Sequence, residues 1–220
     1  MSERTTPVRP RHAASLVIHR RNGNRHEVVM GRRSDKARFK PGVYVFPGGM
    51  LETADFKARP ATALHPAITP KVAVGNSHGR ANALAMAAIR ESMEECGLVA
   101  GVPGDVGPNP DPTWQAMRTL GLAPALDRLV YLGRAITPAV QPIRFHARFF
   151  AIDAEHTSGE LGGSGELSDL RWVDIAEAQQ LEVMFITQLI LKTLQERLGG
   201  GEEKALFLST RLGKRLIAWE

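Results

Sequence analysis

The most constraining feature of this chain is the segment AMAAIRESMEECGL, residues 85–98. An α-helix turns by about 100° per residue, which brings three carboxylates of this segment onto one face: Glu91, Glu94 and Glu95. The opposite face carries Ile89, Met93 and Cys96. The segment therefore predicts a helix that buries its apolar side and directs three acids at one place.

These three carboxylates form an unfavourable cluster on their own. Like charges at helical spacing repel by roughly 0.2–0.5 kcal/mol per pair, so selection for stability alone would avoid them. A divalent cation removes the repulsion. Mg²⁺ and Mn²⁺ suit dense carboxylate oxygens, and they fill their remaining positions with water and substrate phosphate. The cluster therefore predicts a metal site, and the alternative interpretation is a solvated acidic helix face.

The residues around the cluster support the metal site. Arg90 lies four residues before Glu94, where it can form an ion pair along the helix. Gly97 is placed to end the helix in the left-handed conformation. Upstream, FPGGM at residues 46–50 contains Gly48 and Gly49, which allow backbone to pass close to a bound phosphate or metal.

Together these residues resemble the signature of the Nudix hydrolases, G-x5-E-x7-R-E-U-x-E-E-x-G-U, in which U is apolar. Gly49 matches the opening glycine, and residues 90–98 match the closing block. The chain departs from the signature at Asp55, which replaces the first glutamate, at Ser92, and in the 34 residues between Asp55 and Arg90. A long insertion after F-P-G-G-x5-D resembles the peroxisomal-type coenzyme A diphosphatases and their bacterial relatives.

The resemblance implies the Nudix fold, a mixed β-sheet in an α/β/α sandwich, with an insertion inside the signature at about residues 56–83. It also implies an enzyme that cleaves a diphosphate linkage with Mg²⁺ or Mn²⁺. By resemblance, the metal ligands and catalytic acids are Glu91, Glu94 and Glu95. Arg90 corresponds to the catalytic-site arginine that orients them, and Asp55 corresponds to a supporting acid.

In many family members the general base comes from a flexible loop after the signature. Glu166 and Glu160 are the candidates here, because both lie in a glycine-rich segment, residues 155–169. We prefer Glu166, for which the alternative is a solvated loop acid. His146 and His156 are further alternatives.

The substrate is predicted less sharply than the reaction. Coenzyme A diphosphatases carry R-x3-G-x3-F-P-G-G before the box, and this pattern begins here at Arg38 and ends at Gly48 and Gly49. We expect these three residues to bind substrate, and the basic stretch at residues 32–40 suits a phosphate-rich nucleotide. Coenzyme A or acyl-coenzyme A is one expectation. ADP-ribose or NADH, and a non-catalytic nucleotide-binding Nudix domain, are the alternatives.

Composition limits the partners and the compartment. The net charge of +5 favours anionic ligands, but the basic residues form short clusters with few aromatics nearby, so we do not expect nucleic acid as the partner. The single cysteine, Cys96, can form no internal disulfide, which fits a reducing compartment. No run of about eighteen apolar residues occurs, so we expect no membrane association and a cytoplasmic protein.

We expect one Nudix domain over residues 12–220. The alternation of apolar and polar residues, together with the turn residues between the runs, predicts a mixed sheet. Its strands are expected at residues 14–20, 26–33, 43–49, 129–136 and 143–153, with a last core strand at DLRWVDI, residues 169–175.

Helical patterns complete the expected fold. Residues 56–79 are rich in proline and glycine and predict a loop with one short helical turn, and Asn82 is the expected cap of the acidic helix. A short helix is expected near residues 114–120. At about residues 175–220 we expect a long helix, 175–198, and then a hairpin that turns near Gly213. The apolar stripe of that helix fits either the core or the seam of a homodimer.

Overall fold

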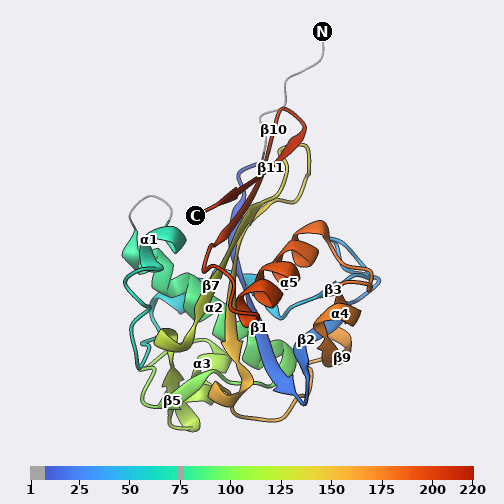
Figure 1. The fold of residues 1–220 in the computed structure, drawn as a ribbon. Coiled ribbons are helices and arrows are strands. Elements are labelled where there is room, and N and C mark those ends of the chain that lie inside the picture. The colour runs from blue at the N-terminus through green and yellow to red at the C-terminus, as the bar shows by residue number, and fades with distance from the viewer. Residues whose placement is uncertain (1–7, 74–76) are drawn as a thin grey trace.

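A single sheet runs through the molecule (Figure 1). The structure is a computed structural model that describes residues 8–73 and 77–220. The strands of this sheet are β1 (Arg11–Asn22), β2 (Arg25–Arg33), β3 (Tyr44–Val45), β4 (Gly48–Met50), β7 (Val130–Ile136), β8 (Phe145–Asp153), β9 (Leu167–Asp174), β10 (Leu206–Arg211) and β11 (Lys214–Trp219). The order is β11-β10-β7-β8-β1-β2-β3, with β4 paired to β1 and β9 paired to β2. Because β1 runs parallel to β8 and antiparallel to β2, the sheet is mixed.

Helices cover both faces of the sheet. On one face lie α1 (Thr69–Val72), α2 (His78–Cys96) and α3 (Pro112–Thr119), and on the other lie α4 (Ile175–Ala178) and α5 (Phe185–Leu198) (Figure 1). Short 3₁₀ turns are η1 (Ala54–Phe56), η2 (Leu126–Arg128) and η3 (Ala154–His156). A separate two-stranded sheet joins β5 (Gly101–Pro103) to β6 (Leu122–Pro124). The predicted α/β/α sandwich is therefore confirmed.

The central strand β1 packs against both layers. Leu16 and Ile18 point into the core beneath α2, whereas Val17 points into the core beneath α5. Successive side chains of a strand face opposite sides of the sheet, so the continuous apolar run of β1 is what a strand covered on both faces requires.

Among the described residues, no helix is long and apolar enough to cross a membrane.

The acidic helix, α2, begins earlier than predicted. Ser77 is its cap, because the Ser77 Oγ accepts a hydrogen bond from the backbone N–H of Arg80 at 3.3 Å. Asn82 lies inside the helix, so the predicted cap was wrong and the last residues of the expected insertion are helical. The C-terminal end is as predicted. Gly97 has a φ of 73°, and its N–H donates to the Met93 carbonyl.

Two predicted elements are divided in the structure. The strand expected at residues 43–49 is split into β3 and β4, which pair with different strands; Pro47 between them has no N–H to donate. The helix expected at residues 175–198 is split into α4 and α5. The chain between them meets β3, where the Tyr44 N–H donates to the Glu182 carbonyl at 2.8 Å, and this pairing replaces helical hydrogen bonds.

Other local predictions are confirmed. β1 and β2 form the expected hairpin, α1 is the short helical turn inside the insertion, and β10 and β11 form the terminal hairpin around Gly213. The parallel pairing of β10 with β7 was not predicted. It makes the C-terminal hairpin part of the main sheet.

Candidate active site

Strand β4 brings the two predicted glycines against the acidic helix. The Gly48 N–H donates to the Glu95 Oε2 at 2.7 Å. A Cβ atom at position 49 would overlap the carboxylate of Glu91, so any other residue there would displace that carboxylate. Gly48 and Gly49 therefore lie between α2 and β1, because each contacts a carboxylate of α2 and also pairs with a residue of β1.

Arg90 is buried and forms hydrogen bonds with several groups of the site. Its side chain is 2% exposed, and its Nε donates to Asp55 Oδ1 at 2.8 Å. The Arg90 Nη1 donates to Glu91 Oε1 at 2.9 Å and to Glu94 Oε2 at 3.1 Å, which confirms the predicted pair with Glu94. The Arg90 Nη2 donates to the Met50 carbonyl at 2.9 Å. One guanidinium thus connects α2, β4 and the beginning of the insertion.

Burial changes the acid chemistry of this cluster. It raises the pKa of Glu91 to about 7, against the opposing charge of Arg90, and the charge of Glu94 raises it further. Burial also raises the pKa of Glu95 to about 8, although the Gly48 N–H acts in the opposite direction. Glu95 is only 6% exposed. The alternative interpretation, a solvated acidic helix face, therefore does not apply to Glu95, because β4 covers it.

The carboxylates are not arranged in advance as a metal cage. In the described part of the chain, no three His, Cys, Asp or Glu side chains are positioned as a ready set of metal ligands. Oxygens of Glu91 and Glu94 face Arg90, and an oxygen of Glu95 faces Gly48. The donors nevertheless fit a hard divalent cation. Mg²⁺ commonly takes only one or two carboxylates, and an added positive charge would offset the burial that raises the pKa of Glu91 and Glu95.

The sequence analysis missed a hydroxyl that contacts the cluster. The Thr113 Oγ1 donates to Glu94 Oε1 at 2.6 Å from the first turn of α3. Asp111 caps that helix by accepting hydrogen bonds from the N–H groups of Thr113 and Trp114. The order Asp-Pro-Thr is a typical helix start, and it signals the turn. It does not signal that the turn lies beside Glu94.

The predicted loop acids lie on the segment that packs against the end of α2. The Gly162 N–H donates to the Cys96 carbonyl at 3.0 Å, and a Cβ atom at Gly97 would meet the Glu160 carbonyl. Glu166 is exposed, and its charge is one of the smaller influences that raise the pKa of Glu95.

The other predicted residues lie elsewhere. Arg38 is exposed in the loop between β2 and β3, and within the described chain no hydrogen bond or ion pair joins it to the glutamates. From the same basic stretch, Arg33 is the cation whose charge lowers the pKa of Glu95. His146 is buried on β8 beside His12, and His156 pairs with its neighbour Glu155.

Solved structures of known proteins share the fold of this chain. No family model matches the sequence. The crystal structure of a NUDIX hydrolase from Alicyclobacillus acidocaldarius is similar, with a TM-score of 0.63 and 28% identity over 84% of this chain and 90% of that one. The chain has the Nudix fold. The mutator MutT protein from Bacillus halodurans shares this fold at a TM-score of 0.53 and 13% identity, over 96% of this chain and 97% of that one.

A sequence relative supports the same superfamily. The protein named "Putative nudix hydrolase 7" from Caenorhabditis elegans is 26% identical over 178 residues, which are 76% of this chain and 52% of the relative. The chain thus spans about half the length of this curated relative. The likenesses support the predicted resemblance to Nudix hydrolases, which are enzymes that cleave diphosphate bonds. They do not distinguish the coenzyme A branch from the others.

The buried pair of Asp55 and Arg90 leads to a stability prediction. Asp55→Asn should lower the free energy of unfolding by about 3 kcal/mol, because the buried Arg90 charge loses its most buried partner. Asp105→Asn is the matched control, since Asp105 pairs with Arg118 at the surface. The control should cost less than about 1 kcal/mol. Unfolding in urea measures both, and equal small losses would contradict the role given to Asp55.

Proposed function

We propose that this chain is a metal-dependent hydrolase that cleaves a diphosphate linkage in a nucleoside diphosphate derivative. The observation that carries the proposal is the cluster in which Arg90 holds Glu91 and Glu94 while β4 holds Glu95. The Nudix fold and the partial sequence match support the same reaction.

The reaction requires charge neutralisation and alignment. A diphosphate resists hydrolysis because the attacking water must approach an anion. A bound Mg²⁺ or Mn²⁺ supplies neutralisation and lowers the pKa of water. In this chain the side chains that would hold the cation are Glu91, Glu94 and Glu95. Arg90 orients Glu91 and Glu94 through its hydrogen bonds to them. Asp55 accepts a hydrogen bond from Arg90 and so fixes the guanidinium. Thr113, on α3, donates a hydrogen bond to Glu94.

Neutral substitutions of the glutamates test the assignment. Glu94→Gln and Glu95→Gln should each lower kcat by about 100-fold or more, because each removes a ligand charge. Both retain an amide oxygen as acceptor, for Thr113 at position 94 and for Gly48 at position 95. Glu203→Gln, at an exposed position outside the cluster, is the matched control. Phosphate release with Mn²⁺ from a panel of diphosphate compounds measures turnover. Near-wild-type rates in both variants would rule out the assignment.

Glu166 is proposed as the general base. It lies in the loop before β9, and its charge acts on Glu95. Glu166→Gln should slow kcat by about 100-fold or more with little change in KM, because proton transfer acts on the chemical step. Glu160→Gln is the matched variant in the same loop. A larger loss for Glu160→Gln would exchange the two roles, and full activity of both variants would exclude a base from this loop.

The proposed substrate is coenzyme A or an acyl-coenzyme A. The spacing S-x3-R-x3-G-x3-F-P-G-G from Ser34 and the long insertion after Asp55 support this choice. ADP-ribose and NADH are the alternative substrates. A Nudix domain that binds a nucleotide without cleaving it is the alternative function.

Chromatography of the products distinguishes these alternatives. Incubation of coenzyme A with the protein and Mn²⁺ should yield 3′,5′-ADP and a phosphopantetheine product. ADP-ribose and NADH are tested in parallel. Rapid cleavage of either one without 3′,5′-ADP from coenzyme A would reject coenzyme A and leave the hydrolase in place. Binding without cleavage, with Mg²⁺ and with Mn²⁺, would favour the non-catalytic domain.

A further inference from the structure

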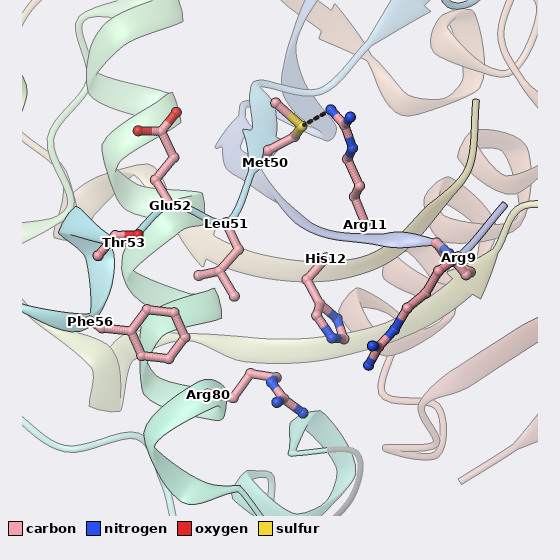
Figure 2. A pocket seen from close by; sticks show the side chains of 10 residues that line it. Arg9, Arg11, His12, Met50, Leu51, Glu52, Thr53, Phe56 and Arg80 are labelled. Carbon is pink, nitrogen blue, oxygen red and sulfur yellow. Dashed lines mark hydrogen bonds between the residues drawn. The ribbon is translucent and has the colours of Figure 1, made fainter. Parts of the chain in front are cut away.

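A cationic pocket lies against the chain that leaves β4, residues 50–53 (Figure 2). Its volume is about 390 Å³, which lies within the range of small-molecule sites. The chain before and within β1, the segment from β4 to η1 and the first turn of α2 all contribute to its wall. Three lining residues are arginines, namely Arg9, Arg11 and Arg80, and Glu52 is the one acid among the lining residues.

Two of the arginines converge on one histidine. Figure 2 shows the side chains of Arg9 and Arg80 reaching toward the His12 ring, whereas Glu52 extends away from it. The pKa of His12 is lowered to about 4, first by burial and then by the charges of Arg148, Arg80 and Arg9. His12 is therefore neutral at physiological pH, and the positive charge of the pocket comes from the arginines.

A buried arginine lies directly behind this histidine. The Arg148 Nη1 is 3.1 Å from the His12 Nδ1, and the Arg148 side chain is fully buried. Among the residues that the structure describes, no carboxylate forms an ion pair with Arg148, and its Nε has no hydrogen-bond partner. Its remaining guanidinium contacts are the carbonyls of His146 and Val72. A buried charge without a paired carboxylate is costly. Arg148 does not line the pocket, but its charge acts on His12, which does, and so adds to the positive potential on that side of the pocket.

The pocket and the acidic cluster share one stretch of chain. The pocket is lined by residues 50–53, and the Met50 carbonyl accepts the hydrogen bond from Arg90 Nη2. The preceding residue, Gly49, touches Glu91. The pocket and the acidic cluster are therefore connected through residues 49–53.

We propose that this pocket binds a phosphate monoester which the substrate carries in addition to its diphosphate. The inference rests on the proposed hydrolase function. A phosphate monoester carries close to two negative charges and three acceptor oxygens, which match several guanidinium groups better than a carboxylate does. The pocket, rather than the exposed basic stretch at residues 32–40, is then the element that selects a phosphorylated nucleotide.

Substrate pairs that differ only in the monoester test the proposal. Coenzyme A is compared with dephospho-coenzyme A, and NADPH with NADH, in the presence of Mn²⁺. For at least one pair, kcat/KM should be about tenfold higher for the phosphorylated member. Arg9→Gln and Arg80→Gln should bring this ratio close to one through KM. Arg25→Gln, which removes a charge at the distant β1–β2 turn, is the matched control and should keep the ratio. Equal kcat/KM within both pairs in the wild-type protein would overturn the proposal.

A binding measurement separates the pocket from the chemistry. Calorimetry without metal compares 3′,5′-ADP with 5′-AMP, and the first should bind about tenfold more tightly to the wild-type protein but not to Arg9→Gln. Inorganic phosphate alone is the third probe. Tight binding of phosphate without a preference for 3′,5′-ADP would overturn the proposal in favour of a separate phosphate ion. Preference for 3′,5′-ADP without hydrolysis of any substrate would refute the hydrolase and leave the pocket standing.

Discussion

The buried guanidinium of Arg90 is the interaction on which the site depends. An arginine that is 2% exposed needs counter-charges, because an uncompensated buried charge costs several kcal/mol. Asp55 supplies the most buried one, and η1 holds it in place. The Glu52 N–H donates to Asp55 Oδ2 at 2.8 Å, and the Asn109 side chain donates to the Ala54 carbonyl at 3.0 Å. The insertion therefore begins from a fixed point, and its length does not separate Asp55 from Arg90.

Local sequence was sufficient to predict the parts of the site that lie on one helix. The spacing of Glu91, Glu94 and Glu95 places them close together along α2, although in the described chain their carboxylates do not converge on one point. Gly97 marks the end of α2 whatever surrounds it. The pair between Arg90 and Glu94 is also local. Because these features depend on helix geometry alone, they were read correctly without knowledge of the fold.

Contacts between distant segments were beyond sequence reasoning. Thr113 reaches Glu94 only because α3 packs beside α2, and Arg33 acts on Glu95 only because β2 lies in the same sheet as β4. The break between α4 and α5 has the same origin. An apolar pattern of helical period continued through residues 179–184, yet pairing of Glu182 with Tyr44 took precedence. The burial of Glu95 could not be predicted for a related reason, since nothing in the helix itself reveals that β4 covers this side chain.

The charges of the two neighbouring sites are unbalanced in opposite directions. In the acidic cluster Arg90 does not offset burial, so the pKa values of Glu91 and Glu95 stay raised. Among the residues that line the pocket, three arginines outnumber the one acid. Glu52, the one acid among the residues that line the pocket, extends away from His12 (Figure 2). A ligand that brings a divalent cation to the glutamates and an anionic group to the arginines would offset both imbalances at once. A phosphorylated nucleotide that binds its metal through a diphosphate has this distribution of charge, and this complementarity relates the proposed reaction to the proposed pocket.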